Sequence, residues 1–204
     1  MNNGTSEPDT LHEARLRYAL GALLDSGART LVDIGCGSGA LLKPAAAHGQ
    51  FRHLLGLEVS GEALAVARRE LAGPIADGRV EVMQTASLEG EGIPEGFDAA
   101  ALVETIEHID PRRLQALEAA LFERAQPDTV VITTPNREYN TLYGLAPGER
   151  RDPDHRFEWD RHRFAEWARR LARRYGYRVV LTGIGEGHPD YGCPTQAACL
   201  RRSH

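Results

Sequence analysis

No apolar run in the sequence approaches the roughly 18 residues that a membrane-spanning helix requires. Only three cysteines are present, Cys36, Cys193 and Cys199, and their spacing matches no zinc motif. Residues 1–10 are polar and short, without the basic start and apolar stretch of a secretory signal. These absences argue against a membrane protein, a disulfide-stapled secreted domain and a zinc ribbon, and they predict a reduced cytoplasmic protein.

Lysine is also scarce, because Lys43 is the only one among 24 basic residues. The net charge of −5 argues against a general nucleic-acid binder. The charge is uneven: 13 Arg stand against 9 Asp and Glu from Arg137 onward, whereas the preceding part carries 11 basic and 20 acidic residues. Arginine binds phosphate with two hydrogen bonds, so a polyanionic partner and compositional drift are both open explanations of the basic C-terminal third.

The length of 204 residues predicts one domain, which we expect to span residues 11–204 after a flexible segment at residues 1–10. Apolar periodicity predicts alternating helices and strands. Helices are expected at residues 11–25, 40–48, 61–71, 111–124 and 161–175, and strands at residues 30–34, 51–59, 80–83, 97–103, 129–133, 178–182 and 196–201. Residues 73–79 are expected to form a loop. Residues 136–160 form a long connection rich in aromatic residues, and such length favours a functional role.

A glycine-rich turn, Gly35-Cys36-Gly37-Ser38-Gly39, joins the strand at residues 30–34 to the next helix. Glycine lets such a turn adopt positive φ and approach a bound molecule closely. A nicotinamide-binding fingerprint has the spacing Gly-x-Gly-x-x-Gly, whereas this turn reads Gly-x-Gly-x-Gly and follows Asp33. An acid at that position suits a cationic ligand. Glu58, about 20 residues further on, stands where the acid of a ribose-binding site is expected.

This arrangement resembles motif I of the class I S-adenosylmethionine-dependent methyltransferases. The resemblance implies an α/β, Rossmann-like fold with a mostly parallel seven-stranded sheet, an antiparallel C-terminal strand and helices on both faces. Asp33 and the turn would hold the methionine end of the cofactor, Glu58 would accept both ribose hydroxyls, and Ser87 and Leu88 would flank the adenine. The expected cofactor-binding residues are Asp33, Gly35, Gly37, Gly39, Glu58, Ser87, Leu88 and Val103.

The stretch Ala101–Asp110 starts as an apolar strand and then presents Glu104, Glu107 and His108. Offsets of three and four residues would place these side chains on one side of a helical turn. Carboxylate oxygens suit Mg²⁺ or Mn²⁺, and an imidazole shifts the preference toward Mn²⁺. The alternative, on these residues alone, is an exposed first helical turn in which acids favour the helix N-terminus.

Two further motifs follow, Thr134–Asn140 and Asp154–Trp159. Together with Glu104–His108 they resemble the bacterial branch of the HEN family of small-RNA 3′-terminal 2′-O-methyltransferases. The ending Gly192–Gln196 is similar to the family's Gly-x-Pro-x-Gln, and the resemblance spans roughly residues 11 to 200. One stretch departs from the family, because its Ser-Leu-Thr-Tyr-Arg-Asp is Ser-Leu-Glu-Gly-Glu-Gly at residues 87–92.

The resemblance implies methyl transfer from S-adenosylmethionine to the 2′-hydroxyl of an RNA 3′ end, with one divalent metal ion, Mn²⁺ or Mg²⁺. The catalytic and metal residues would be Glu104, Glu107, His108 and His155. The expected RNA contacts are Thr134, Pro135, Asn136, Arg137, Tyr139 and Asn140, with phosphates near Arg150, Arg151 and Arg156. A metal that contacts both terminal ribose oxygens would lower the pKa of the 2′-hydroxyl. The substrate would therefore need free 2′- and 3′-hydroxyls.

Full-length bacterial members of that family also carry a large N-terminal half linked to RNA repair and ligation. The expected partners are therefore RNA and the kinase, phosphatase and ligase components of RNA repair, with no membrane and a monomeric chain. The sequence fits an isolated domain and a free-standing methyltransferase alike. Two alternatives remain open: a metal-dependent O-methyltransferase of a small vicinal diol, and a non-catalytic subunit that binds the cofactor or RNA.

Overall fold

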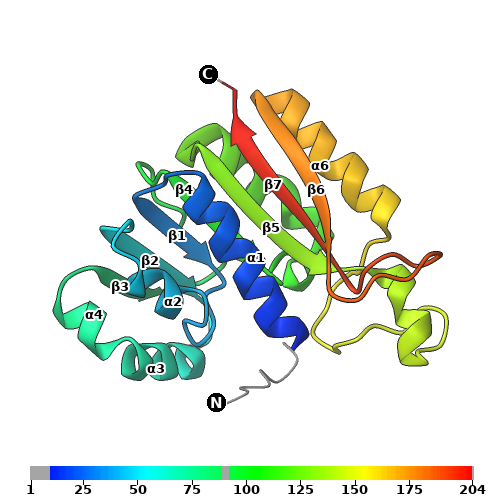
Figure 1. Cartoon of the computed structure of the whole chain (residues 1–204), viewed down its shortest axis with the longest axis horizontal. Helices are drawn as coiled ribbons and strands as arrows, with labels where there is room; N and C mark the ends of the chain where they lie inside the picture. Colours follow the sequence, from blue (N-terminus) through cyan, green and yellow to red (C-terminus); the bar gives the residue numbers. More distant parts are fainter. Residues whose placement is uncertain (1–9, 89–91, 204) are drawn as a thin grey trace, which may run out of the picture.

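The computed structural model describes residues 10–88 and 92–203, so most of the expected flexible segment and residues 89–91 of the departing stretch lie outside it. A seven-stranded sheet with the order β3-β2-β1-β4-β5-β7-β6 forms its centre (Figure 1). The strands are β1 (Thr30–Ile34), β2 (His53–Glu58), β3 (Val80–Gln84), β4 (Ala99–Val103), β5 (Thr129–Pro135), β6 (Tyr177–Ile184) and β7 (Thr195–Arg202). Strands β1 to β5 pair in parallel, while β7 is antiparallel to both β5 and β6. The predicted fold class and the antiparallel C-terminal strand are confirmed.

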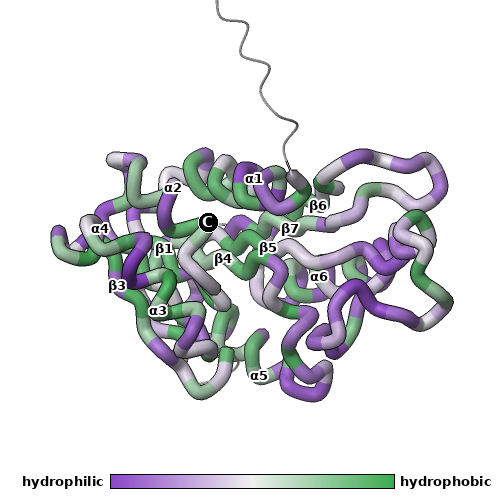
Figure 2. Tube along the Cα trace, turned by 90° about the horizontal axis from the view of Figure 1, so that it is seen from below, coloured by the Kyte–Doolittle hydropathy of each residue, from purple (hydrophilic) through white to green (hydrophobic). Residues whose placement is uncertain are grey.

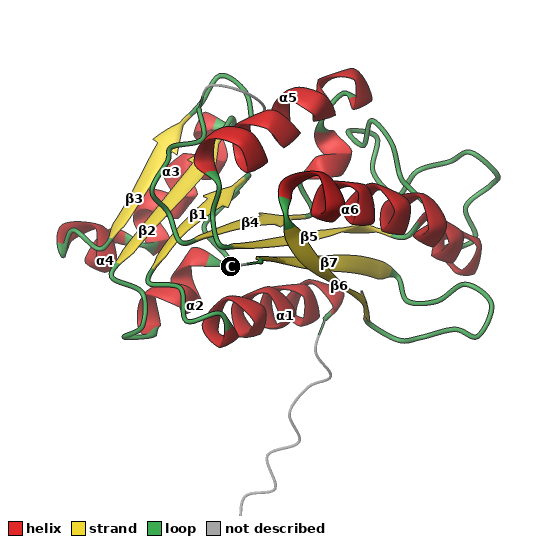
Figure 3. Ribbon diagram, turned by 90° about the horizontal axis from the view of Figure 1, so that it is seen from above, coloured by secondary structure: helices red, strands yellow, loops and turns green. Residues whose placement is uncertain are grey.

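Helices cover both faces of the sheet, with α1 and α2 on one face and α5 and α6 on the other (Figure 3). The α-helices are α1 (Leu11–Asp25), α2 (Leu42–Ala47), α3 (Gly61–Glu70), α4 (Ala72–Ala76), α5 (Leu114–Ala119) and α6 (Arg161–Tyr175). Capping residues explain their starts. Thr10 and Glu13 form a reciprocal capping box at α1, and the side chain of Asp160 accepts a hydrogen bond from the Arg163 backbone N–H at the start of α6.

The central strands are apolar because both of their faces are covered. All five residues of β1 and all seven of β5 are buried. Figure 2 shows the resulting hydrophobic centre and the hydrophilic stretches in the connection that follows β5. Among the described residues, no helix is long and apolar enough to cross a membrane.

Three connections differ from the sequence-based expectation. Residues 73–79 were expected to be a loop, but α4 lies there. The expected helix at residues 111–124 is divided into a 3₁₀ turn η2 (Pro111–Arg113), α5 and a π-helical segment η3 (Ala120–Ala125). The long connection after β5 contains the 3₁₀ helix η4 (Arg137–Tyr143). Short helical turns of this kind lack the apolar repeat that makes longer helices visible in a sequence.

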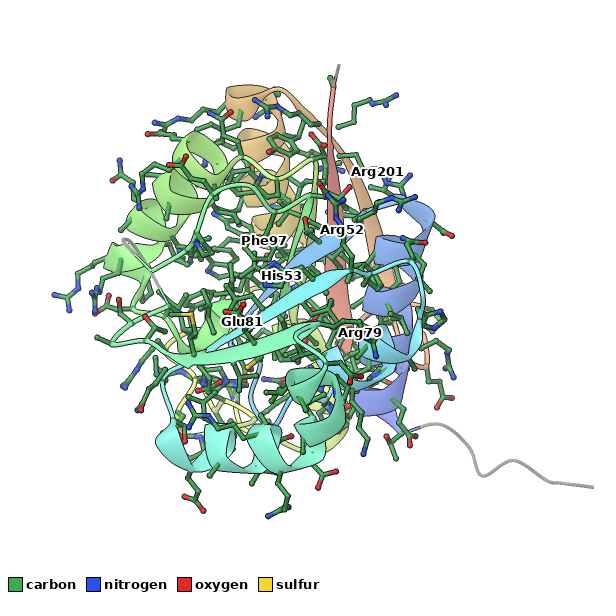
Figure 4. The ribbon with its side chains drawn as sticks, turned by 90° about the vertical axis from the view of Figure 1, so that its left-hand side faces the viewer. Arg52, His53, Arg79, Glu81, Phe97 and Arg201 are labelled. Atoms are coloured by element: carbon green, nitrogen blue, oxygen red, sulfur yellow. The ribbon has the colours of Figure 1, made fainter. Side chains whose placement is uncertain are left out.

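The outer edge of the sheet at β3 carries a small cluster of side chains (Figure 4). The ring of His53 lies 5.2 Å from that of Phe97, and its Nε2 lies 3.4 Å from Glu81 Oε1. His53 begins β2 and Glu81 lies near the start of β3. The cluster therefore lies toward the amino ends of these strands, opposite to the edge at which parallel sheets bind ligands.

Candidate active site

The carboxyl ends of β1, β2, β4 and β5 meet at one edge of the sheet. In register, Asp33 on β1 pairs with Gly56 on β2 and with Ala101 on β4, while Val103 pairs with Thr133 on β5. Open α/β sheets bind ligands at this edge. The segments that leave these strand ends contain nearly all of the expected site residues.

The glycine turn after β1 is held by close backbone packing. Gly35 has φ +77°, and a Cβ atom on it would lie 2.7 Å from the Thr105 side chain. Gly37 has φ +54°, and its N–H donates a 2.9 Å hydrogen bond to Glu58 Oε2. Glu58 Oε1 also accepts from the backbone N–H groups of Val59 and Ser60, at 2.8 Å each. The carboxylate expected to bind ribose thus already joins the turn to the end of β2.

A cavity of about 200 Å³ lies beside this turn. Its lining includes the expected cofactor residues Asp33, Gly35, Gly37 and Val103. Two residues of α1 that the sequence did not indicate, His12 and Leu16, also line it. Helix α1 thus covers the cavity that would receive the methionine end of the cofactor. No sequence signal could have identified His12 and Leu16, because only the packing of α1 brings them to the cavity.

Gly39, Ser87 and Leu88, like Glu58, lie outside that lining. A Cβ atom on Gly39 would lie 2.7 Å from the side chain of Leu71, so Gly39 allows close helix packing. Leu88 lies next to Gly35, with its Cδ1 at 3.4 Å from the position of a Cβ atom there. The Ser87 carbonyl accepts a hydrogen bond from Thr85. Leu88 therefore borders the turn, and Ser87 precedes it in the chain.

Asp33 is buried with 2% of its surface exposed. Burial, and then the neighbouring Glu58 carboxylate, raise the pKa of Asp33 to about 7. A cationic ligand in the cavity would favour the ionised form and lower this pKa. The site is therefore suited electrostatically to a positively charged group.

The segment after β4 does not form the expected helical turn. Glu104 has φ +52°, in the left-handed region, and only Ile106–His108 form a 3₁₀ turn, η1. The assumption that Glu104, Glu107 and His108 share one side of an α-helix is therefore wrong. Non-glycine residues in the left-handed region are strained and concentrate at functional sites.

The Glu104 carboxylate faces α1. Its Oε2 lies 2.9 Å from Arg15 Nη2, and its Oε1 accepts a 2.9 Å hydrogen bond from the Thr133 hydroxyl. Burial raises the pKa of Glu104, and the charge of Arg15 opposes that shift. Arg15 also donates a 2.8 Å hydrogen bond to Thr195. Arg15 therefore places a positive charge beside the Glu104 carboxylate, which the sequence predicted to bind a metal ion.

Three other expected ligands do come together. Glu107, His108 and His155 each offer a ligand atom, and these atoms lie within 4.8 Å of one another. The rings of His108 and His155 lie 4.9 Å apart, edge to face. Glu107 is fully buried, and while its Oε2 accepts a 2.9 Å hydrogen bond from the Thr134 hydroxyl, its Oε1 has no partner within the described chain.

The electrostatics of these three residues fit a cation. Burial, and then the Glu104 charge, raise the pKa of Glu107 well above its ordinary value. Burial and the neighbouring His155 lower the pKa of His108, which favours the neutral imidazole, the form that binds metals. An unpaired buried carboxylate oxygen and two imidazoles form a donor set that suits a divalent ion. The residues present therefore fit the implied metal.

Glu158 orients His155 and was not expected from the sequence. The Nδ1 atom of His155 lies 2.6 Å from Glu158 Oε1, and both side chains are buried. Burial alone would raise the pKa of Glu158, but hydrogen bonds from Asn140, His155 and the Arg151 backbone lower it overall. Histidine ligands are commonly held by a carboxylate in this way. The motif Asp154–Trp159 contained the signal, since Glu158 follows His155 by three residues.

The expected RNA-binding loop splits into buried and accessible residues. Asn136 is fully buried and donates to the carbonyls of Tyr191 and Cys193, at 2.7 and 2.9 Å. Asn140 donates to Glu158, while Thr134 and Pro135 are buried in or beside β5. Arg137 is exposed and Tyr139 is half-buried. Of the six expected RNA contacts, only Arg137 and Tyr139 have side chains that reach the surface.

The three arginines expected near phosphates also differ in their surroundings. Arg151 donates to Asn140 Oδ1 at 2.6 Å and to the carbonyls of Pro194 and Asn136, so its side chain ties the loop together. Arg150 donates a 2.7 Å hydrogen bond to the His155 carbonyl. Arg156 is exposed, and its backbone N–H donates to the Glu107 carbonyl at 2.6 Å. Arg150 and Arg156 are both exposed, whereas Arg151 is half-buried.

Comparison with known proteins gives a consistent set of relatives. Residues 32–131 match a family profile described as a methyltransferase domain. The crystal structure of the methyltransferase domain of bacterial CtHen1 is 35% identical, with a TM-score of 0.82, and the alignment covers 94% of this chain and 100% of that one.

Small RNA 2′-O-methyltransferases are also similar in sequence. The Arabidopsis thaliana protein is 29% identical over 212 residues, covering 94% of this chain and 22% of its own length. The Xenopus tropicalis protein is 29% identical over 206 residues, covering 95% of this chain and 55% of its own length. The chain thus spans between about a fifth and about half of the length of these two relatives.

Proposed function

The chain belongs to the Hen1 methyltransferase family, and from that premise we propose that it transfers the methyl group of S-adenosylmethionine to the 2′-hydroxyl of the 3′-terminal nucleotide of RNA. The observation that carries this proposal is the grouping of Glu107, His108 and His155 within 4.8 Å. It lies at the same sheet edge as the cavity that Asp33 lines. A methyl donor and a hydroxyl acceptor can therefore meet there.

The cofactor side of the site would bind the methionine end and the ribose of S-adenosylmethionine. S-adenosylmethionine, when bound, supplies an electrophilic methyl group on a sulfonium. The Asp33 carboxylate attracts the cationic methionine end, and the positive-φ glycines of the turn let the backbone approach it. Glu58 presents a carboxylate at the end of β2, where a ribose hydroxyl pair would be accepted.

The acceptor half presents the metal ligands. Glu107, His108 and His155 would hold a divalent cation, with Glu104 as the fourth ligand if it turns away from Arg15. Such a cation, when bound, lowers the pKa of a coordinated hydroxyl. Glu158 holds the His155 ring through Nδ1 and leaves Nε2 for the ligand role. Arg137 and Tyr139 stand at the accessible side of the loop, where they would contact the terminal nucleotide.

A vicinal diol explains the preference for a 3′ end. Only the last nucleotide of an RNA carries free 2′- and 3′-hydroxyls together, so a site that recognises both oxygens excludes internal nucleotides. Association with RNA-repair kinase, phosphatase and ligase components, and a cytoplasmic location, belong to this proposal as its cellular setting. They are tested by co-purification of those components with the chain.

The experiment is methyl transfer from labelled S-adenosylmethionine to short RNAs with different 3′ ends, with Mn²⁺, with Mg²⁺ and with a chelator. We expect transfer to an unblocked RNA, none to a 3′-terminal 2′-deoxynucleotide, a strong loss with a 3′-phosphate, and a loss with the chelator. Equal transfer to the 3′-phosphate RNA would contradict the proposal. Efficient transfer to catechol but not to RNA would favour a small-diol methyltransferase instead.

A His108→Ala variant separates catalysis from simple binding. Because His108 lies in the proposed metal site and outside the lining of the cofactor cavity, the change should abolish methyl transfer and leave cofactor affinity nearly unchanged. Undiminished methyl transfer by this variant would contradict the metal site.

A further inference from the structure

Helices α5 and α6 lie on one face of the sheet (Figure 3), and residues of both line a groove of about 730 Å³. Its residues include four arginines of α6, together with Trp159 and a proline of η2. They are Pro111, Trp159, Arg163, Arg170, Arg173 and Arg174. We call this feature the α5–α6 groove. It has no part in the methyl-transfer chemistry described above.

The spacing of the arginines places them along one side of α6. Arg163, Arg170 and Arg174 are separated by seven and four residues, which are same-face offsets in an α-helix. At about 1.5 Å per residue, the row from Arg163 to Arg174 extends about 16 Å. The lining contains these arginines and Arg173 but only two carboxylates, Glu118 and Glu166. The groove is therefore positive in a chain whose net charge is −5.

The α5–α6 groove includes two residues that closely follow proposed metal ligands in the chain. Pro111 follows His108 by three residues, and Trp159 follows His155 by four. Exposed Arg156 lies between His155 and Trp159 in the chain, and its backbone is bonded to that of Glu107. A strand whose last nucleotide lies at His108 and His155 would thus meet the groove within a short distance.

Not all of the arginines serve to hold the fold together. Arg170 is bonded to buried Glu118 at 2.8 and 3.1 Å, and Arg174 pairs with Glu123 at 3.1 Å. Arg163 lies over the Trp159 ring, 5.4 Å from its centre, and has no carboxylate partner in the described part of the chain. Arg173 is exposed and makes no recorded ion pair within residues 10–88 and 92–203. Arg163 and Arg173 can therefore turn to a ligand without loss of an internal pair.

Trp159 provides a second sign of a ligand. Its side chain is 5% exposed and lines the groove, yet its Nε1 has no hydrogen-bond acceptor in the described structure. Arg163 covers its ring. A phosphate that draws Arg163 aside would bring an acceptor oxygen close to this indole N–H, which is otherwise an unpaired buried donor.

We infer that the α5–α6 groove binds the phosphodiester backbone of the RNA strand whose 3′ end occupies the active site. This inference rests on the proposed function. Guanidinium groups match phosphate oxygens with paired hydrogen bonds, and backbone contacts of this kind position a strand without reading its sequence. The groove would therefore favour longer RNAs over very short ones, regardless of sequence.

The test compares binding of a trinucleotide and a twelve-nucleotide RNA by wild type, Arg163→Ala/Arg173→Ala and Arg169→Ala. Arg169 is a matched control, because it is an exposed arginine of α6 outside the groove lining. Fluorescence anisotropy over a series of salt concentrations gives the affinity and its salt slope. Two lost phosphate contacts should weaken binding of the long RNA about tenfold at about 0.15 M salt and reduce the log–log slope by about 1.4.

We expect wild type and Arg169→Ala to bind the long RNA more tightly than the trinucleotide, and the double alanine variant to lose most of that gain. An Arg163→Lys/Arg173→Lys variant should recover the salt slope, because the charges return. The inference would be overturned if the double alanine variant kept both the wild-type preference for the long RNA over the trinucleotide and the wild-type salt slope, whatever else the groove binds. Methyl transfer by wild type to both RNAs separates a failure of this inference from a failure of the proposed function. If wild type methylates neither the trinucleotide nor the long RNA, the result counts against the proposed function.

Discussion

The imidazole of His155 is held through its Nδ1 by the buried carboxylate of Glu158, at 2.6 Å. Because hydrogen bonds keep the pKa of Glu158 below its ordinary value, the carboxylate is ionised and accepts the proton of Nδ1. An imidazole that donates from Nδ1 in this way presents its Nε2 atom on the opposite side of the ring as the ligand atom. This pair fixes one ligand of the proposed metal site.

Glu158→Gln tests this relationship. The amide cannot hold the same tautomer as firmly, so we expect Mn²⁺ affinity to fall about 10- to 100-fold, while cofactor affinity stays within about twofold of wild type. Isothermal titration with each ligand measures both. Glu81→Gln is the control, since Glu81 lies at the far β3 edge, and unchanged Mn²⁺ affinity in Glu158→Gln would contradict the role of Glu158 (Figure 4).

Glu104→Gly tests whether the Glu104 carboxylate serves the metal site or the fold. Glycine removes the left-handed cost, which is about 1–2 kcal/mol, while the variant loses the ion pair to Arg15. We expect the free energy of unfolding to change by less than about 1 kcal/mol and methyl transfer to be lost. Gln126→Gly provides the control, because Gln126 has φ +50° and is exposed, far from the ligands in sequence.

That control should be as stable as wild type or slightly more so, with full activity. If Glu104→Gly instead unfolds more easily by several kcal/mol, the Glu104 carboxylate serves the fold through Arg15 and Thr133 and not the metal. Chemical denaturation of both variants separates these outcomes.

The pKa of Asp33 predicts a pH dependence of cofactor affinity. The free protein holds a proton on Asp33 up to about pH 7, and the cationic cofactor prefers the ionised form. Affinity should therefore fall up to about tenfold for each pH unit below about 7 and stay level above it. Glu58, His12 and Cys36 are the other ionisable groups around Asp33, and burial raises the pKa of the Cys36 thiol, so it stays neutral in this range.

Asp33→Asn should bind the cofactor weakly and without this pH dependence, whereas His12→Gln should keep it. A pH profile that disappears in His12→Gln would assign the dependence to the histidine. The same raised pKa has a consequence for stability. Because the unfolded chain releases the Asp33 proton near pH 4 and the folded chain near pH 7, the Asp33 contribution should make the apoprotein less stable as the pH rises between these values.

The buried acid of α5 predicts a stability effect away from the site. Glu118 accepts a 2.7 Å hydrogen bond from Trp167 Nε1 and two from Arg170. Glu118→Ala leaves the indole N–H without its acceptor, so we expect a loss of about 2 kcal/mol in urea denaturation. Gln115→Ala, on the exposed side of α5, should change the free energy of unfolding by less than about 0.5 kcal/mol. Equal losses of unfolding free energy in Glu118→Ala and Gln115→Ala would contradict a stabilising role of the Glu118 hydrogen bonds.

Most of the fold followed from the sequence, because its long helices and buried strands carry clear apolar patterns. The bounds of α1 and α6 agree with the expectation residue for residue. Segments whose structure depends on local backbone conformation could be predicted less well from the sequence. The helical periodicity assumed at Glu104–His108 does not exist, because the chain takes a left-handed turn at Glu104 before η1.

The candidate site was predictable only in part, for a physical reason. Residue type and spacing indicate Asp33 and Glu107, and the family resemblance indicates His155. Their partners come from tertiary packing: Arg15 reaches Glu104 from α1, and His12 reaches the cavity from the same helix. Such contacts leave no local pattern, so only the structure identifies them.

The position of the transferred methyl group tests the central proposal most directly. After reaction with an unblocked RNA, complete nuclease digestion followed by mass spectrometry identifies the methylated nucleoside. The proposal predicts a single 2′-O-methylated nucleoside that derives from the 3′ terminus. A methyl group on a base or on an internal ribose would contradict it.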